Sequence, residues 1–293
     1  MNIAITGATG FLGKALIDEF KNSSDWVFAI VRNSTCIFSD DVGVIVCGNI
    51  DSKTNWSDKL KGIDVLVHSA ARVHVLNETS GDPLESFREV NTKGTIELAK
   101  AAASNGVRRF VFISSIKVHG EENDSLEPFV ENKHITPLDP YGISKFEAEQ
   151  QLTQLGDATG MDIVIIRPPL IYGPGVKANF RTMISLVSRR FPLPLGKVTT
   201  KRSLINIDNM VDFVKCCAVH PRAAGEIFLI SDQHDLTVTQ LLRALGEEMN
   251  KKAILLPVPM FLLAFAANIF SRKDLATKLL GNLQVDSSKA TKL

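Results

Sequence analysis

The chain has 293 residues, of which 45% are hydrophobic and 22% are charged, and its formal net charge is +1. This is the composition of an ordinary globular protein, long enough for one large or two smaller domains with an ample core. The near-zero net charge gives no electrostatic reason to expect binding to nucleic acid or attraction to an anionic membrane.

The cysteines predict neither a metal site nor a disulfide framework. The chain has four of them, with no CxxC pair and no histidines at metal-ligand spacing, which favours reduced thiols. The chain starts directly with an apolar strand and shows nothing typical of a signal peptide. We therefore expect a cytoplasmic protein.

The chain opens with a predicted strand, a glycine turn and a helix. Asn2–Thr6 is a short apolar run typical of a strand buried on both faces, and residues 14–20 carry apolar side chains at helical spacing. Between them, Gly7 permits a tight turn, Gly10 lets a pyrophosphate approach the backbone, and Gly13 lets the helix pack close to the strand. The order predicts a dinucleotide phosphate cradle. The first two glycines stand one residue further apart than in the standard fingerprint, and a turn that binds nothing is the alternative.

The first half of the chain then alternates short apolar runs with helical patterns, which predicts parallel strands joined by crossover helices. Further strands are expected at residues 26–31, 42–46, 63–68, 109–113 and 162–166, with helices at 87–103 and from Pro140 onward. The fold class is α/β, a doubly wound parallel sheet of Rossmann type with a smaller C-terminal substrate-binding lobe.

The pattern becomes less regular after Arg167, where prolines and glycines stop any helix and the chain leaves the first domain. A strand at 201–207, a helix at 208–218, a strand at 225–230 and a helix at 237–249 follow. We expect an NAD(P)-binding domain at 1–167, to which 204–231 returns, and a substrate-binding lobe made of 168–203 and 232–293.

Residues 253–270 form the most apolar segment of the chain. Pro257, Pro259 and Asn268 within it argue against a helix that spans a membrane. We interpret the segment as a core or lid helix, with peripheral contact to a membrane as the alternative.

The residues after the second to fourth strands bear on the cofactor. An arginine at the end of the second strand favours a 2′-phosphate on the adenosine ribose, so Arg32 tilts the prediction from NAD towards NADP. A solvated surface arginine is the alternative. Asn49 and Ile50 follow the third strand, where the adenine would lie. The small residues Ala70 and Ala71 follow the fourth strand and would let the backbone run beside the diphosphate and ribose.

The histidines and the short basic run carry no ligand prediction. His68 and His74 have no carboxylate or cysteine at ligand spacing, so we interpret them as packing and hydrogen-bonding residues and predict no metal. The pair Arg108 and Arg109 is too short a basic run to indicate nucleic acid.

A serine, a tyrosine and a lysine carry the predicted chemistry. Asp139 is the expected N-cap and Pro140 suits the first helical position, which puts Tyr141 and Lys145 one turn apart on one helix face. A protonated lysine near the phenol would lower the pKa of the tyrosine, which could then take the proton of a carbinol hydroxyl while hydride leaves the same carbon. Ser115, at the end of the fifth strand, could hydrogen-bond the same oxygen.

In this combination the chain resembles the extended short-chain dehydrogenases/reductases of the nucleotide-sugar epimerase/dehydratase group. The resemblance covers essentially the whole chain. It rests on the motifs Thr6–Gly13, Ser114–Gly120 and Tyr141–Lys145, and is extended by Arg167–Gly175 and Arg202–Asp208.

The resemblance implies a set of site residues. Ser115, Tyr141 and Lys145 would be catalytic. With the positions given above, cofactor binding would come from Gly7, Thr9, Gly10, Phe11, Leu12, Gly13, Arg32, Asn49, Ile50, Ala70, Ala71, Tyr141, Lys145, Pro168 and Ile171, the last two flanking the nicotinamide. Substrate binding would come from Ser115, Lys117, Asn179 and Arg202. Arg202 would meet the diphosphate of the sugar nucleotide, and a surface strand arginine is its alternative.

Four features depart from the pattern of this group. Arg32 replaces the acidic residue expected of strict NAD users. His119 stands where tyrosine is usual, and Leu170 stands where many members place an asparagine that touches the sugar nucleotide. The sequence also stops at Asp286–Leu293, where similar proteins continue into a further turn and helix. We expect a shortened C-terminus.

The leading hypothesis from the resemblance is a 4-epimerase that acts on a nucleotide-activated or lipid-linked amino sugar, such as an N-acetylated UDP-sugar, in O-antigen or surface-polysaccharide synthesis. The alternative is an NADPH-dependent 4-keto-sugar reductase. A dehydratase would carry an Asp-Glu pair after the active-site serine, which is absent from Ser115–Lys117. A cofactor-sensing protein without catalysis is a further alternative. Relatives often pair through two helices, and residues 92–103 and 144–155 could form such a homodimer.

Overall fold

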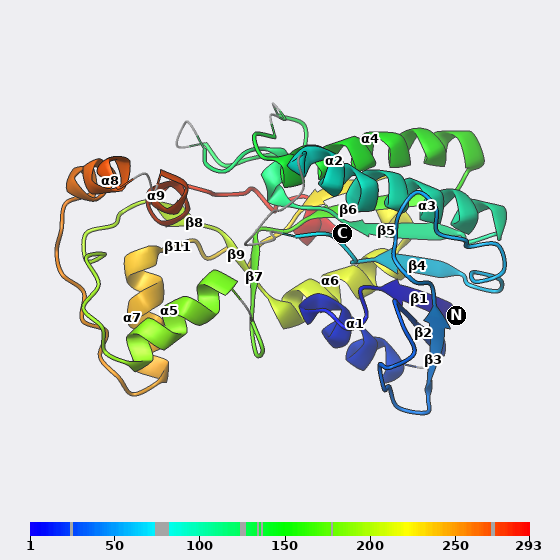
Figure 1. Cartoon of the computed structure of the whole chain (residues 1–293), viewed down its shortest axis with the longest axis horizontal. Helices are drawn as coiled ribbons and strands as arrows, with labels where there is room; N and C mark the ends of the chain where they lie inside the picture. The colour runs from blue at the N-terminus through cyan, green and yellow to red at the C-terminus, as the bar shows by residue number, and fades with distance from the viewer. Residues whose placement is uncertain are drawn as a thin grey trace.

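The computed structural model describes residues 1–23, 26–73, 82–123, 127–133, 135, 137–176, 178–270 and 273–293. Figure 1 shows a sheet flanked by helices and, at the left of the view, a smaller group of helices and short strands.

A parallel sheet of seven strands forms the larger part of the described chain. Its order is β10-β6-β5-β4-β1-β2-β3, with all neighbours parallel. The strands are β1 (Asn2–Thr6), β2 (Trp26–Val31), β3 (Val42–Val46), β4 (Val65–His68), β5 (Arg109–Ile113), β6 (Asp162–Arg167) and β10 (Ile227–Leu229). Every residue of β4 and β5 is buried, as expected for strands covered on both faces. The predicted doubly wound sheet is confirmed.

Helices cover both faces of this sheet. Helices α1 (Phe11–Lys21) and α6 (Ile207–Val219) pack on one face with Ile3 and Ile5 of β1. The other face is covered by α3 (Thr95–Ser104) and α4 (Pro140–Thr159), which pack near Ala4. The alternation of side chains along a strand therefore divides the core into two layers.

The helix predicted at 87–103 is longer and less regular than expected. It begins as α2 (Pro83–Phe87), continues through the π-helical turn η1 (Arg88–Gly94) and ends as α3. Such π-helical turns are rare and leave no strong trace in apolar spacing.

The remaining elements lie mostly in the smaller group. They are η2 (Ile116–Val118), β7 (Leu170–Tyr172), α5 (Ala178–Ser188), β8 (Lys201–Arg202), β9 (Leu204–Asn206), η3 (Pro221–Ala223), β11 (Leu236–Thr237), α7 (Val238–Glu248), α8 (Met260–Ile269), α9 (Lys273–Leu280) and η4 (Ala290–Lys292). The strand predicted at 201–207 is split at Ser203, whose backbone N–H donates to the Leu283 carbonyl. A small core that includes Val187, Val238 and Leu242 holds this group together. The division into two domains stays a prediction.

The interpretation of residues 253–270 as a core helix is wrong, whereas the lid helix stays a prediction. Only Met260–Ile269 is helical, and no residue of α8 is buried. Phe261 is 70% exposed and Phe265 is 64% exposed. Apolar composition alone does not tell a buried helix from a surface one. No helix in the described part of the chain is both long and apolar enough to cross a membrane.

Candidate active site

The candidate site lies at the carboxyl ends of the sheet strands, around β1, β4 and β5. From β1 the chain adds β2 and β3 on one side of the sheet, and then β4, β5, β6 and β10 on the other side of β1. Open α/β sheets bind ligands at the switch point that this change of side creates, here between β1 and β4. The glycine turn, the Ser115 loop and the start of α4 all follow strand ends on this edge or pack against them.

The glycine turn has the geometry of a phosphate cradle. Gly7 adopts a φ of +68°, and a Cβ there would lie 2.8 Å from the Ala70 nitrogen. A Cβ on Gly13 would lie 2.1 Å from the Gly7 carbonyl oxygen, so only glycine allows α1 to pack this close to the turn. Gly10 is the N-cap of α1 and offers no side chain to the helix N–H groups. These residues fit the diphosphate of a dinucleotide.

Buried polar side chains fix the ends of β1 and β4 beside this turn. The His68 ring lies 2.7 Å from Thr6 Oγ1 through Nδ1 and 2.9 Å from Thr95 Oγ1 through Nε2. Burial lowers the pKa of His68 to about 3, so the ring is neutral. Ser69 Oγ donates to the Thr6 carbonyl. The predicted packing and hydrogen-bonding role of His68 is confirmed, whereas His74 lies outside the described residues.

Asn91 ties the segment after β4 to α4 and was missed as a positioning residue. Its Oδ1 accepts from the Arg72 N–H at 2.8 Å, and its Nδ2 donates to the Arg72 carbonyl and to Ser144 Oγ. Asn91 is buried within the π-helical turn. The available signal was an asparagine within the helix predicted at 87–103.

The predicted adenosine end of the site is more open. Arg32 is exposed immediately after β2, and Ile50 is buried after β3. The Asn49 carbonyl accepts from Thr54 Oγ1 at 2.5 Å. Ala70 and Ala71 follow β4 as half-buried residues. The roles of these residues toward a cofactor remain predictions.

The start of α4 places the catalytic candidates as the sequence predicts. Asp139 is the N-cap, and its Oδ1 accepts from the N–H groups of Tyr141 and Gly142 at 3.0 and 3.2 Å. Pro140 occupies the first helical turn. Tyr141 and Lys145 then stand one helical turn apart.

Tyr141 and Ser115 come together from different elements. The Ser115 side chain accepts from the Lys117 N–H and caps η2 after β5, and its hydroxyl lies near enough to the Tyr141 phenol to influence the phenol's pKa. The Tyr141 ring packs edge-on against Phe87, with 6.1 Å between ring centroids. Burial raises the pKa of Tyr141 to about 12, and the nearby Ser115 hydroxyl opposes the rise.

Lys145 is directed at the end of β5. The side chain is buried, with Nζ donating to the Ile113 carbonyl at 2.8 Å and lying 4.3 Å from the centroid of the Phe112 ring. Burial lowers the pKa of Lys145 to about 7, and the Glu149 carboxylate opposes that fall.

The expected lowering of the Tyr141 pKa by Lys145 is not what the structure shows. The shift has the opposite direction because loss of hydration outweighs the other influences on the phenol. The Lys145 ammonium donates to the Ile113 carbonyl and interacts with the Glu149 carboxylate. These two groups offset part of its electrostatic effect on the Tyr141 phenol. A cationic nicotinamide ring, when bound, would add positive charge beside both groups.

A buried ion pair lies beneath the catalytic candidates and was not predicted. Arg167 Nη2 donates to Glu149 Oε2 at 2.6 Å, and both side chains are almost fully buried. Ser114 Oγ donates to Glu149, and Arg167 Nη1 donates to the Glu131 carbonyl at 3.0 Å. Glu149 follows Lys145 by four residues, so helical spacing was the signal that could have revealed it.

His119 belongs to this buried network. Its Nε2 lies 2.9 Å from Arg167 Nη1, and its ring stacks on Phe129 with 5.1 Å between centroids. Burial, together with the Arg167 charge, lowers the pKa of His119 to about 3, so Nε2 accepts the hydrogen bond. His119, which stands where tyrosine is usual in the group that the sequence resembles, therefore accepts a hydrogen bond from the Arg167 guanidinium.

The predicted substrate residues are already engaged within the protein. Lys117 Nζ lies 3.0 Å from both Asp139 Oδ2 and Glu121 Oε1. Arg202 Nη1 donates to the Gly281 carbonyl at 2.9 Å. The Asn179 side chain lies outside the described residues.

The residues predicted to flank the nicotinamide follow β6. The Pro168 carbonyl accepts from the Ile116 N–H at 3.0 Å, which holds this segment beside the Ser115 loop. Ile171 lies in β7, half-buried against the core, and Leu170 beside it is exposed.

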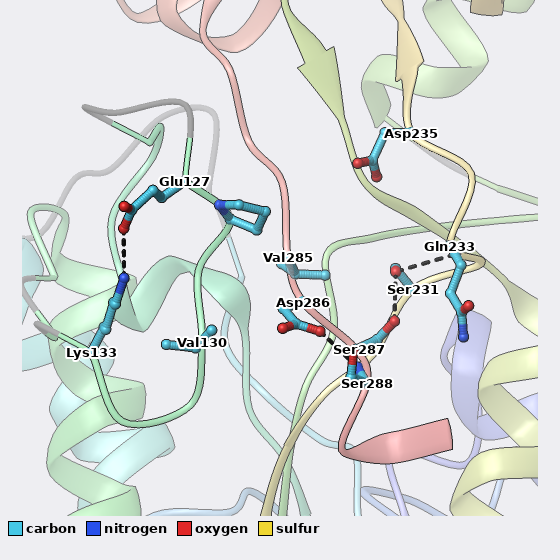
Figure 2. Close-up of a pocket in the computed structure, with 11 residues that line it drawn as sticks. Glu127, Val130, Lys133, Ser231, Gln233, Asp235, Val285, Asp286, Ser287 and Ser288 are labelled. Atoms are coloured by element: carbon cyan, nitrogen blue, oxygen red, sulfur yellow. Dashed lines mark hydrogen bonds and ion pairs between the residues drawn. The ribbon is translucent and has the colours of Figure 1, made fainter. Parts of the chain in front are cut away.

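A separate cavity of about 450 Å³ is lined by none of these predicted residues. Figure 2 shows that it lies among three segments, with the Glu127–Lys133 ion pair on one wall and Ser231, hydrogen-bonded to Ser287, on another. Its lining residues are Glu127, Pro128, Val130, Lys133, Ser231, Gln233, Asp235, Val285, Asp286, Ser287 and Ser288.

The lowered pKa of Lys145 predicts a pH-dependent stability. Its pKa is 10.5 when unfolded and about 7 when folded, so between these values the unfolded chain binds the extra proton and the free energy of unfolding rises with pH. Relative to Lys145→Met, wild type should gain on the order of 4 kcal/mol from pH 7 to 10.5. Urea unfolding of both proteins across this range measures the difference. A constant difference would show that Lys145 is charged when folded throughout.

Comparisons with known proteins place this geometry in a family. The NAD dependent epimerase/dehydratase family model matches residues 3–231. A UDP-glucose 4-epimerase from Vibrio cholerae is 43% identical over 289 residues, which cover 98% of this chain and 88% of that protein. The N-acetyl-alpha-D-glucosaminyl-diphospho-ditrans,octacis-undecaprenol 4-epimerase of Escherichia coli O157:H7 is 26% identical over 266 residues, which cover 89% of this chain and 77% of that protein.

Solved structures share the fold. The UDP-glucuronic acid 4-epimerase from Bacillus cereus in complex with NAD matches with a TM-score of 0.79 at 22% identity, covering 100% of this chain and 92% of that one. MoeE5 in complex with UDP-glucose and NAD matches with a TM-score of 0.77 over the same shares. The resemblance inferred from the glycine turn and the Tyr141–Lys145 motif is confirmed: the chain belongs to the NAD dependent epimerase/dehydratase family.

Proposed function

We propose that the protein is an NAD(P)-dependent nucleotide-sugar 4-epimerase. The observation that carries the proposal is the placement of Tyr141 and the buried Lys145 one helical turn apart on α4, where Lys145 Nζ donates to the Ile113 carbonyl at the end of β5 and Ser115 caps the turn that follows this strand. The glycine turn that fits a dinucleotide diphosphate lies on the same edge of the sheet. The named activity of the 43% identical relative, UDP-glucose 4-epimerase, supports this choice.

The catalytic residues would divide the proton chemistry at the sugar C4 hydroxyl. NAD, when bound, supplies an acceptor and donor of hydride at that carbon. Ser115 would hold the C4 oxygen while Tyr141 takes its proton, and Tyr141 would return the proton when hydride comes back to the opposite face. Lys145 would stabilise the phenolate together with the cationic nicotinamide ring of bound NAD, because the ammonium alone does not offset the effect of burial on the Tyr141 pKa.

The substrate we propose is a UDP-sugar, including N-acetylated forms, used in surface-polysaccharide or O-antigen synthesis. The E. coli relative that acts, by its name, on an N-acetylglucosaminyl diphospholipid supports the N-acetylated choice. We place the cofactor in residues 1–167 with 204–231, and the sugar nucleotide in the lobe made of 168–203 and 232–293. Arg202 would meet the diphosphate through donors other than the Nη1 that binds Gly281. Pairing through α3 and α4 into a homodimer remains a prediction.

Turnover assays test this function directly. Purified protein is assayed for bound nucleotide and then incubated with UDP-glucose and with UDP-N-acetylglucosamine, while C4 configuration is followed by proton NMR. Interconversion of C4 epimers without net change in NAD(P)H supports the epimerase. Consumption of NADPH with a 4-keto sugar instead would establish the reductase, the second candidate, which the exposed Arg32 favours.

The cofactor prediction rests on Arg32. Arg32→Asp is expected to reduce the affinity for NADPH relative to NADH by about tenfold or more, because a guanidinium at the end of β2 binds a 2′-phosphate and a carboxylate repels it. Fluorescence titration with both cofactors measures the ratio. Arg108→Asp, an exposed arginine just before β5, is the matched control. An unchanged ratio in Arg32→Asp would refute the NADP preference.

A further inference from the structure

One end of the smaller lobe carries a large exposed apolar surface, here called the tip surface. It is formed by α8 and by the segments 189–197 and 251–258. In Figure 1 the second segment runs along the left edge of the molecule into α8. Its exposed apolar side chains are Phe191, Ile254, Leu256, Phe261, Leu262, Phe265, Ile269 and Phe270.

The two segments and α8 form one continuous surface. The Leu193 N–H donates to the Ile254 carbonyl at 2.9 Å, and the Leu256 N–H donates back to the Leu193 carbonyl at 2.8 Å. Leu263 of α8 packs in the same small core as Leu193. Backbone hydrogen bonds and shared core packing therefore hold the segments that carry the exposed rings together.

Helix α8 turns its largest apolar side chains outward. Phe261, Phe265 and Ile269 are spaced by four residues, so they share one helix face, and all three are more than 60% exposed. The half-buried positions include Leu263 and Ala266, on the opposite side. A helix facing only water would place polar residues outward, so an apolar patch of this kind indicates a contact surface.

The tip surface is also basic. Its exposed charged residues are Arg189, Arg190, Lys197, Lys251 and Lys252, and neither 186–201 nor 249–270 contains an acidic residue. Lys251 Nζ donates to the Ser188 carbonyl, which holds the two basic pairs near each other. The nearest acids along the chain, Glu247 and Glu248, end α7. This local charge contrasts with the net charge of +1 for the whole chain.

We propose that the tip surface docks on an anionic phospholipid bilayer, with the α8 rings at the acyl boundary and the basic side chains among the headgroups. The 10 residues of α8 are too few to cross the bilayer, so the helix would lie on its surface. A symmetric contact between two copies is disfavoured, because it would bring the same cations face to face. This docking does not depend on which sugar the enzyme converts.

Vesicle co-sedimentation tests the docking with the full chain. Wild type should bind vesicles that contain phosphatidylglycerol and should bind pure phosphatidylcholine vesicles much less. The triple variant Phe261→Ser/Phe265→Ser/Ile269→Ser should lose at least about tenfold in partition coefficient. Lys251→Glu/Lys252→Glu should weaken binding to the anionic vesicles, as should high salt. The control Ile37→Ser/Val219→Ser removes equally exposed apolar side chains elsewhere and should bind like wild type.

Three results would overturn the proposal. The first is no vesicle binding by wild type, and the second is equal binding by the triple variant and wild type. The third is equal binding of wild type to vesicles with and without phosphatidylglycerol. Size-exclusion chromatography supplies a further check. A wild-type dimer that the triple variant converts to a monomer would identify the tip surface as a self-association face instead.

Discussion

Replacing Tyr141 with phenylalanine is expected to lower epimerase turnover by about a thousandfold, because the variant keeps the ring but loses the group that carries the C4 proton. The Tyr141 ring packs edge-on against Phe87. The phenylalanine can keep the ring contact, so stability should change little. Initial rates with UDP-glucose, measured beside the amount of bound NAD(P), separate lost chemistry from lost cofactor.

The second tyrosine of the chain provides the control. Tyr172 donates from its hydroxyl to Asp232 at 2.9 Å and stacks on Phe180, so Tyr172→Phe removes the same oxygen atom from a hydrogen-bonded ring. It should keep turnover close to that of wild type. Near-normal turnover by Tyr141→Phe, or equal losses in the two variants, would rule out Tyr141 as the proton carrier.

Local patterns in the sequence predicted the sheet and the order of the catalytic candidates. The apolar run Asn2–Thr6 became β1 with the same ends, and the N-cap at Asp139 set the phase that puts Tyr141 and Lys145 on one face. Both features depend on neighbours within one or two turns of chain. Sequence spacing alone therefore contains them.

Features set by distant contacts were not predictable in the same way. Lys117 meets Asp139, 22 residues away, and Glu149 meets Arg167 across the end of the sheet. The direction of the Tyr141 pKa shift depends on burial, which spacing does not give. The apolar residues of α8 gave no sign of facing outward, since hydrophobicity is the same on a core and a docking surface.

The buried Glu149–Arg167 pair predicts a large stability effect. Arg167→Met should destabilise the fold by about 3–5 kcal/mol, because it leaves the Glu149 carboxylate buried without its cation. The Arg167 guanidinium also donates to the Glu131 carbonyl and to His119 Nε2, so the substitution removes the hydrogen-bond donor of both acceptors. A shift of the urea unfolding midpoint at pH 7 measures the loss.

The double variant separates an uncompensated charge from lost packing. In Arg167→Met/Glu149→Leu both charges are gone, so part of the lost stability should return, as it does when a buried ion pair is replaced by apolar side chains. If the double variant is instead less stable than Arg167→Met by the full cost of Glu149→Leu alone, the pair is not coupled.

The turnover of the double variant should remain below that of wild type even where stability recovers, because Glu149 supports the charged form of Lys145 beneath Tyr141. A double variant with wild-type turnover would show that the pair serves the fold alone.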